Sequence, residues 1–383
     1  MKRSTKIACI LAAVLIGAGV ICASVGFVFM DFDFFTLNTT ETVKNTHLID
    51  DAFTSIAVDT SDCDVNLIPA EGDACRVECI EAENRMHQVA VKNGTLCITE
   101  IDTRHWYDHI GFGLFKQLEI NLYLPVAVYE SLSVHTNTGD LSVTAGSFSD
   151  LKAETDTGDV EITTGAYKTL EVTTHTGDIR LEHAVVGVEL SLDTDTGSIH
   201  LNLCDVSSAR AETNTGNVTI SAGAVCSFVI ETDTGDVNLK NLTANGLSVT
   251  CNTGAISLTE VDVKSNVILE TDTGDISLTS CNAFTISALT DTGDVELEAC
   301  FPTNLSVTTD TGDVALSYCD DKYITVKTQT GDVEGVLLSG KIFDCKSDTG
   351  DVRVPTNGSD GTCTVTSDTG DIEINVQPKE RNS

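Results

Sequence analysis

Aspartate beside a repeated glycine is the feature of this sequence with the clearest capacity for chemistry. In three consecutive copies of a repeat, one Asp follows a Thr-Gly pair and another precedes that glycine by two residues: Asp272 and Asp275, Asp291 and Asp294, Asp310 and Asp313. Carboxylate oxygens are the ligands that Ca²⁺ prefers in proteins. One interpretation is therefore a structural Ca²⁺ held between repeats. The preferred alternative is a hydrated acidic turn in which Asp only caps the backbone.

An aromatic segment is the second candidate site. Residues 105–115 contain the only tryptophan of the chain. Exposed aromatic side chains are enriched where proteins bind partners, so we consider Trp106, Tyr107, Phe112 and Phe115 as residues that bind a protein, a glycan or a membrane surface. An apolar lid on the end of the fold is a slightly preferred interpretation of the same residues. A metal site formed by the two histidines of this segment is the least favoured.

The cysteines indicate burial rather than chemistry. The chain has 14 of them, and Cys281, Cys300 and Cys319 each lie seven residues after the glycine of consecutive repeats. We expect most to be reduced and buried as small apolar side chains. Disulfides between neighbouring repeats are the alternative, because exported proteins can form them. No C-x-x-C pair occurs, so no zinc site is predicted, and Cys75 with Cys79 is the nearest approach to one.

Motifs of catalysis are missing from the sequence. It contains no nucleophile elbow, P-loop or zinc-protease motif, and its carboxylates recur evenly instead of gathering with basic residues in one repeat. We therefore predict no catalytic residue, no cofactor beyond the Ca²⁺ considered above, and no enzymatic activity. A polysaccharide-acting β-helix enzyme assembled from scattered repeats is the least favoured alternative.

A repeat of the form L-x-V-x-T-D-T-G-D-V-x-L positions these residues. It occurs in thirteen copies, whose glycines lie 19 or 20 residues apart from Gly139 to Gly370. Apolar and polar residues alternate on both sides of the glycine, which predicts two short strands joined by a turn. The first Thr of the motif, such as Thr155, has the parity of the apolar residues, so we expect a buried stack of threonines. Because so small a unit cannot bury its apolar side alone, the predicted fold is an all-β, β-solenoid or β-helix-like rod.

The segment before the repeats follows the same pattern loosely. The template fits around Cys63 if this residue takes the place of glycine, and Cys63 precedes Gly139 by 76 residues, four intervals of 19. Asn93-Gly94 indicates a hairpin, and residues 120–125, which end in Leu-Pro, indicate a further strand. We predict that residues 48–130 are a degenerate β region that caps the solenoid of residues 131–377, and that residues 378–383 are a tail.

The N-terminus has the pattern of a membrane anchor. Residues 7–30 include no charged side chain over 24 positions, which is long enough to cross a bilayer as a helix. Lys and Arg precede this run while Asp and Glu follow it, so the positive-inside rule places residues 1–6 in the cytoplasm. Residues 31–47 then form a juxtamembrane spacer. A cleaved signal peptide is less favoured because its apolar region is usually shorter. We expect a single-pass cell-membrane protein with an extracellular C-terminal β domain.

These features together resemble a known group. The anchor, the degenerate β region and the tandem TDTGDV or TNTGDL repeats are similar to the bacterial putative-adhesin family of surface β-repeat proteins, formerly a domain of unknown function. The resemblance covers about Ile56 to Val376 and implies a surface β-repeat fold. The formal net charge of −36 argues against nucleic acid as a partner.

The predicted function is that of a non-enzymatic cell-surface adhesin or scaffold. Its expected contacts are the membrane, through the N-terminal helix, and cell wall, matrix or another surface protein. The alternative from a different class is a regulatory or envelope-stress sensing membrane subunit.

Overall fold

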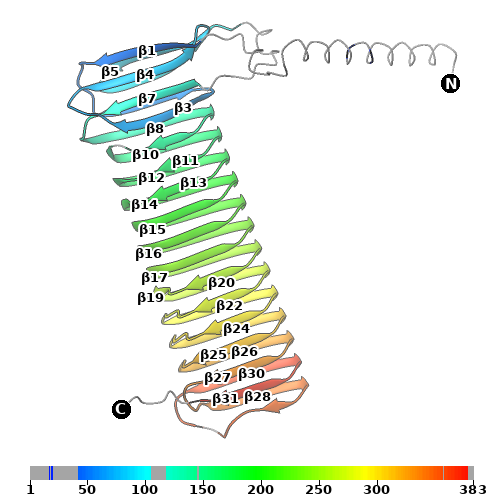
Figure 1. The fold of residues 1–383 in the computed structure, drawn as a ribbon. Helices are drawn as coiled ribbons and strands as arrows, with labels where there is room; N and C mark the ends of the chain where they lie inside the picture. Colours follow the sequence, from blue (N-terminus) through cyan, green and yellow to red (C-terminus); the bar gives the residue numbers. More distant parts are fainter. Residues whose placement is uncertain are drawn as a thin grey trace, which may run out of the picture.

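The computed structural model describes residues 42–104, 118–144, 146–356 and 358–377, together with Gly17 and Gly19. They form a long rod of stacked β coils (Figure 1), which confirms the predicted all-β solenoid. No helix of the described residues is long and apolar enough to cross a bilayer. Most of the predicted anchor, residues 7–30, and the aromatic residues Trp106, Tyr107, Phe112 and Phe115 lie outside the described residues.

Each coil contributes one strand to each face of the rod. In the coil around Gly312, β24 (Asn304–Thr311) comes before the Thr-Gly turn and β25 (Val314–Cys319) after it. Side chains alternate between buried and exposed along both strands, because successive residues of a strand point to opposite sides. Strands before the turn pair in parallel with their equivalents in the neighbouring coils, and so do strands after it. Equivalent apolar residues therefore stack in register and form one continuous core.

The first face contains the strands that precede each turn. They are β2 (Ser55–Thr60), β8 (Val128–Thr138), β10 (Ser147–Thr157), β12 (Gly165–Thr176), β14 (Ala184–Thr196), β20 (Asn266–Thr273), β22 (Thr285–Thr292), β24, β26 (Tyr323–Thr330), β28 (Ile342–Thr349) and β30 (Thr362–Thr369).

The second face contains the strands that follow each turn. They are β3 (Cys63–Pro69), β9 (Leu141–Val143), β11 (Val160–Ile162), β13 (Ile179–Glu182), β18 (Ile256–Thr259), β21 (Ile276–Thr279), β23 (Val295–Glu298), β25, β27 (Val333–Leu337), β29 (Val352–Arg353) and β31 (Ile372–Val376). Between β14 and β18 the strands β15 (Ile199–Thr215), β16 (Val218–Thr234) and β17 (Val237–Thr253) run unbroken from the second face to the first, and β19 (Asp262–Val263) lies at the same corner.

The corner opposite the Thr-Gly turn is made by a residue with a left-handed backbone. In consecutive coils this residue stands six positions after the glycine; examples are Leu203, Ala222 and Asn241, with φ of 53°, 61° and 52°. Left-handed backbone is uncommon for residues other than glycine. The residue that follows is turned inward, and Cys204, Cys281, Cys300 and Cys319 are buried there.

The N-terminal cap differs from the four degenerate turns suggested by the 76-residue spacing. Strands β2 and β3 form one true coil, with Ile56 beside Leu132 and Val65 beside Leu141, so the alignment of Cys63 with glycine is confirmed. The chain then leaves the solenoid and forms β4 (Cys75–Ala82), the hairpin of β5 (Arg85–Lys92) and β6 (Thr95–Asp102), and β7 (Leu118–Leu124).

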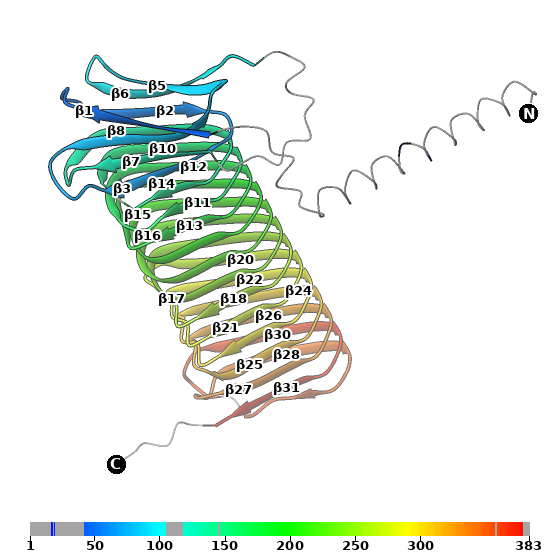
Figure 2. The ribbon, with the colours of Figure 1, turned by 45° about the horizontal axis from the view of Figure 1, so that its top comes forward.

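Two short sheets therefore extend the two faces at this end (Figure 2). On the first face β6 pairs with β2 and carries β5 at its edge. On the second face β7 pairs with β3, β4 with β7, and β1 (Thr42–Ile49) with β4. Strand β1 includes residues assigned above to the spacer; its mostly polar residues lack an apolar face, and pairing with β4 is what orders them.

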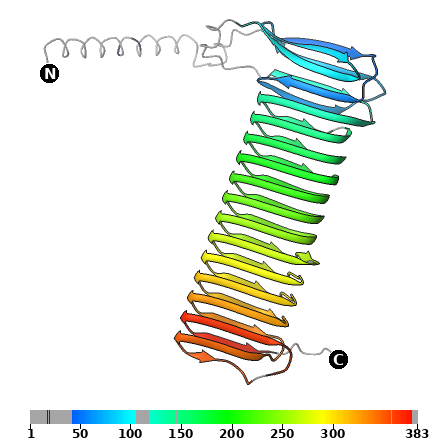
Figure 3. The same cartoon turned by 180° about the vertical axis from the view of Figure 1, so that it is seen from behind.

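The last two coils are stacked out of chain order. Strand β30 lies between β26 and β28, and β31 lies between β27 and β29. Figure 3 shows the red strands of the C-terminal residues enclosed by an orange coil that ends the rod. The repeat around Gly370 thus stacks on the repeat around Gly331, and the repeat around Gly350 is outermost.

Candidate functional site

The Thr-Gly turn is the most regular site of the molecule. A side chain at Gly293 would overlap the carbonyl oxygen of Gly274, its equivalent in the neighbouring coil. The buried Thr309 donates a hydrogen bond from Oγ1 to the carbonyl oxygen of Gly293 at 3.2 Å. The same contact recurs along the rod, and the predicted burial of the threonine stack is confirmed. These turns hold the coils at a fixed spacing.

The aspartate that follows ten of the thirteen glycines forms a ladder. Asp294 Oδ1 accepts a hydrogen bond from the backbone N–H of Asp313 at 2.8 Å, and Asp275 Oδ1 accepts from Asp294 N–H at 2.9 Å. Asn217 does the same for the N–H of Asp236 at 2.8 Å. One oxygen of each side chain is therefore engaged in joining coils, a role that needs an acceptor but no charge.

The second aspartate column, two residues before the glycine, is interrupted by amides that donate hydrogen bonds to it. Asn214 donates to Asp195 at 3.0 Å, Asn252 to Asp233 at 2.9 Å and Gln329 to Asp310 at 2.6 Å. Asp272, Asp291 and Asp310 follow one another without an intervening amide.

All six aspartates singled out above as a Ca²⁺ site are exposed. The structure places them in two parallel columns and does not gather them into a compact group of ligands. Among the described residues, the one group of three His, Cys, Asp or Glu side chains whose ligand atoms all lie within 4.8 Å of one another is elsewhere.

That group lies in the N-terminal cap and consists of Cys79, Glu81 and His87, all buried. Cys79 and Glu81 are two residues apart on β4 and therefore point to the same side. His87 enters from β5, and its Nδ1 is 2.9 Å from Glu81 Oε2. Cys63 Sγ lies 3.9 Å from His87 Nε2. Sequence analysis missed this group, although the i, i+2 spacing followed by a tight turn was a usable signal.

A buried ion pair borders this group. Arg85 donates to Glu100 and to Asp62, both at 2.6 Å. Burial alone would raise the pKa of Glu100, but the hydrogen bonds from Arg85 and from the Ser61 N–H hold it below its usual value. Burial raises the pKa of Cys63 to about 11 and that of Cys79 to about 12. Cys63 beside His87 is therefore a protonated, enclosed thiol, which is a poor nucleophile.

The described cysteines are mostly buried, as the sequence predicts. Twelve cysteines lie in the described residues, all as free thiols, and nine of these are buried. Cys281, Cys300 and Cys319 stack in consecutive coils and donate to backbone carbonyls, for example Cys281 to Thr279 O at 3.4 Å. They serve as small core residues.

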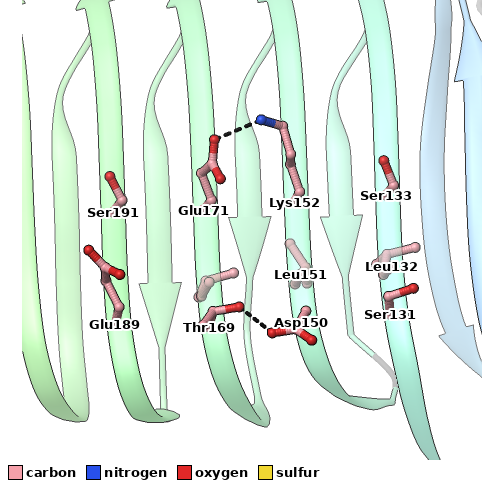
Figure 4. Close-up of a pocket in the computed structure, with 11 residues that line it drawn as sticks. Ser131, Leu132, Ser133, Asp150, Leu151, Lys152, Thr169, Glu171, Glu189 and Ser191 are labelled. Atoms are coloured by element: carbon pink, nitrogen blue, oxygen red, sulfur yellow. Dashed lines mark hydrogen bonds and ion pairs between the residues drawn. The ribbon is translucent and has the colours of Figure 1, made fainter.

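A shallow hollow of about 520 Å³ crosses the first face over β8, β10, β12 and β14 (Figure 4). Leucines line its floor, including Leu132 and Leu151. Lys152 pairs with Glu171 at 2.8 Å, and Thr169 donates to Asp150 at 2.5 Å (Figure 4). Pairing occupies these acidic groups, so the hollow has the character of a polar sheet surface.

Comparisons with known proteins match one family model and several solved structures. The family model described as Toastrack DUF4097 matches residues 53–226, 164–301 and 255–382. No curated protein matches the chain.

A solved structure titled a putative adhesin, from Parabacteroides merdae, is 12% identical and covers 68% of this chain and 97% of its own, with a TM-score of 0.37. Another so titled, from Bacteroides fragilis, is 13% identical and covers 88% and 98%, with a TM-score of 0.26. A Parabacteroides distasonis structure titled a putative lipid binding protein is 11% identical and covers 87% and 98%, with a TM-score of 0.20.

Proposed function

The chain belongs to the Toastrack DUF4097 family, and from that premise we propose that it is a non-enzymatic scaffold or adhesin that projects a stiff acidic rod from the cell surface. The observation that carries the proposal is the in-register stack of coils with a continuous core. Every coil is joined to the next by parallel strand pairing on both faces and by side-chain ladders at the turn. Such a stack resists bending and sets a fixed distance between its ends.

The net negative charge of the chain supports a spacer that does not associate with other molecules until it meets a specific partner. The aspartate columns contribute to the net charge of −36. Like charges along the rod oppose lateral association of copies, and acidic side chains discourage pairing at exposed strand edges. Anchoring by residues 7–30 would place the cap near the membrane and the C-terminal coils at the distal end.

The experiment compares adhesion of cells that carry rods of different length. Deletion of residues 217–274 removes three whole repeats and joins Gly216 to Asp275 in register, which shortens the rod by roughly 14 Å. A matched control restores the length with a second copy of residues 275–331. We expect the full-length chain to promote attachment to matrix-coated or cell-coated surfaces, the deletion to weaken it, and the length-matched variant to recover it.

The outcomes separate the two halves of the proposal. Recovery by the length-matched variant supports a spacer, whereas loss in both variants supports an adhesive surface within residues 217–274. Equal attachment of cells with and without the full-length chain overturns the proposal and favours the sensing alternative.

A further inference from the structure

The N-terminal cap contains a set of metal-binding side chains that an adhesive rod does not require. Cys79 and Glu81 come from β4, which extends the second face, and His87 comes from β5, which edges the first face. Their ligand atoms lie within 4.8 Å of one another. Each side chain is buried, so their closeness results from packing of the cap and not from chance contact on a surface.

We propose that Cys79 Sγ, Glu81 Oε2 and His87 Nδ1 bind a Zn²⁺ ion. One thiolate, one imidazole and one carboxylate are ligand types that Zn²⁺ takes together, whereas Ca²⁺ and Mg²⁺ require oxygen ligands. Cys63 lies beside the other ring nitrogen, 3.9 Å from Nε2, so the fourth position of a tetrahedral site is left to water.

The surrounding hydrogen bonds hold these ligands as a metal site requires. His87 Nε2 lies 3.0 Å from Thr60 Oγ1, which leaves Nδ1 directed at Glu81. Glu81 Oε1 accepts from Asn45 Nδ2 at 2.6 Å, and Oε2 also accepts from the His87 backbone N–H at 2.6 Å. Outer partners of this kind orient ligands in known metal sites, and their loss typically weakens binding.

The charge close to this group favours a cation. Glu81, Asp62 and Glu100 supply three carboxylates there, and Arg85 supplies one guanidinium. A bound Zn²⁺ would displace the thiol proton of Cys79 to solvent, because a coordinating thiol is deprotonated by the ion.

A metal here would join the two faces where the solenoid begins. Apart from the Ala82–Arg85 pair at their turn, β4 and β5 diverge into separate sheets. An ion bound between them would tie these sheets together and close the end of the core.

The test uses the full-length chain in mild detergent, reduced and stripped of metal with a chelator. We expect one equivalent of Co²⁺ to bind with the absorption of thiolate-to-cobalt charge transfer, and Zn²⁺ to displace it. Cys79→Ser and His87→Gln should abolish that absorption, and Asn45→Ala should weaken binding by roughly 10–100-fold. Two controls should bind as the wild type does: Cys319→Ser, an equally buried cysteine in the rod, and Glu78→Gln, on the same strand with its side chain directed outward.

A wild-type chain that is folded by circular dichroism yet binds neither Co²⁺ nor Zn²⁺ overturns the proposal and leaves the group as a hydrogen-bonded network. Binding that persists unchanged in Cys79→Ser overturns it as well. Should the ligand variants fail to fold, the wild-type melting temperature decides: a rise with Zn²⁺ that Mg²⁺ does not reproduce supports the site, and no rise contradicts it.

Discussion

At the scale of single residues, the turn glycine has a steric role that no other residue can take. Its Cα faces the carbonyl oxygen of the equivalent glycine in the next coil, so any β-carbon would separate the coils. The buried Thr three positions before the glycine donates a hydrogen bond to the neighbouring coil, and the Asp after the glycine accepts one. Three residues of the motif thus join neighbouring coils.

Gly293→Ala tests this role. The new methyl group would overlap Gly274 O, so we expect the free energy of unfolding to fall by about 3 kcal/mol or more, measured by urea denaturation. Gly246→Ala is the control, because nothing lies within 4 Å of the position where its methyl group would stand. That change should alter stability by less than about 1 kcal/mol. Equal effects of the two substitutions would refute the steric explanation.

At the scale of elements, a buried lysine joins the coils whose order is exchanged. Lys341, 2% exposed, precedes the outermost strand β28. Its Nζ contacts Asp320 Oδ1 at 2.9 Å, Ser339 Oγ at 2.7 Å and the Asp360 carbonyl oxygen at 3.1 Å. One ammonium group therefore joins segments from three coils.

Asp321, beside this junction, makes stability depend on pH. Burial raises its pKa from 3.8 to about 8, although Lys341 opposes the shift. Its carboxyl group is protonated in the folded chain and ionised in the unfolded chain between these values. Its contribution to stability is therefore complete below about pH 4 and is lost as pH rises towards about 8.

Asp321→Asn removes that dependence. We expect the variant to melt at nearly the wild-type temperature at pH 4 and at a higher temperature at pH 8. Asp320→Asn is the matched control with the opposite sign. Burial tends to raise the pKa of Asp320, but hydrogen bonds from Ser339 and Lys341 hold it below its usual value, so its loss should destabilise the chain above pH 4. An unchanged melting temperature of Asp321→Asn at both pH values would contradict the assignment.

At the scale of the whole molecule, charge and stacking oppose each other. Carboxylates one strand spacing apart repel by roughly 1 kcal/mol in water. The ladder of Asp side chains to backbone N–H groups and the interleaved amides offset part of this repulsion. Monovalent salt should therefore stabilise the rod, because the Debye length is only about 10 Å at 0.1 M.

Thermal unfolding of the full-length chain in Ca²⁺, in Mg²⁺ and in EDTA, at equal ionic strength, tests the aspartate columns. We expect equal midpoints in the two divalent ions, since these aspartates are exposed and one oxygen of each Asp after a glycine already accepts a hydrogen bond. A rise specific to Ca²⁺ would contradict this expectation and make Asp272, Asp291 and Asp310, with their partners after the glycine, the ligands.

Much of the rod followed from the sequence alone, because a repeat provides its own alignment. Thirteen copies show which positions are always apolar, always Thr or always Gly, and the period of two identifies strands without homologues. The burial of Thr155 and its equivalents, the hairpin at Asn93-Gly94 and the place of Cys63 in the first turn were all predicted and confirmed.

The arrangement of the two ends of the rod could be known only from the tertiary structure. Nearly identical repeats can stack on one another in any order, so local pattern could not reveal that the Gly370 repeat inserts before the Gly350 repeat. In the cap, sheet pairing and not sequence spacing sets which residues meet. Strands β4 and β5 diverge from a tight turn toward opposite faces of the rod. Cys79, Glu81 and His87 come together because the buried side chains of both strands point into the same interior.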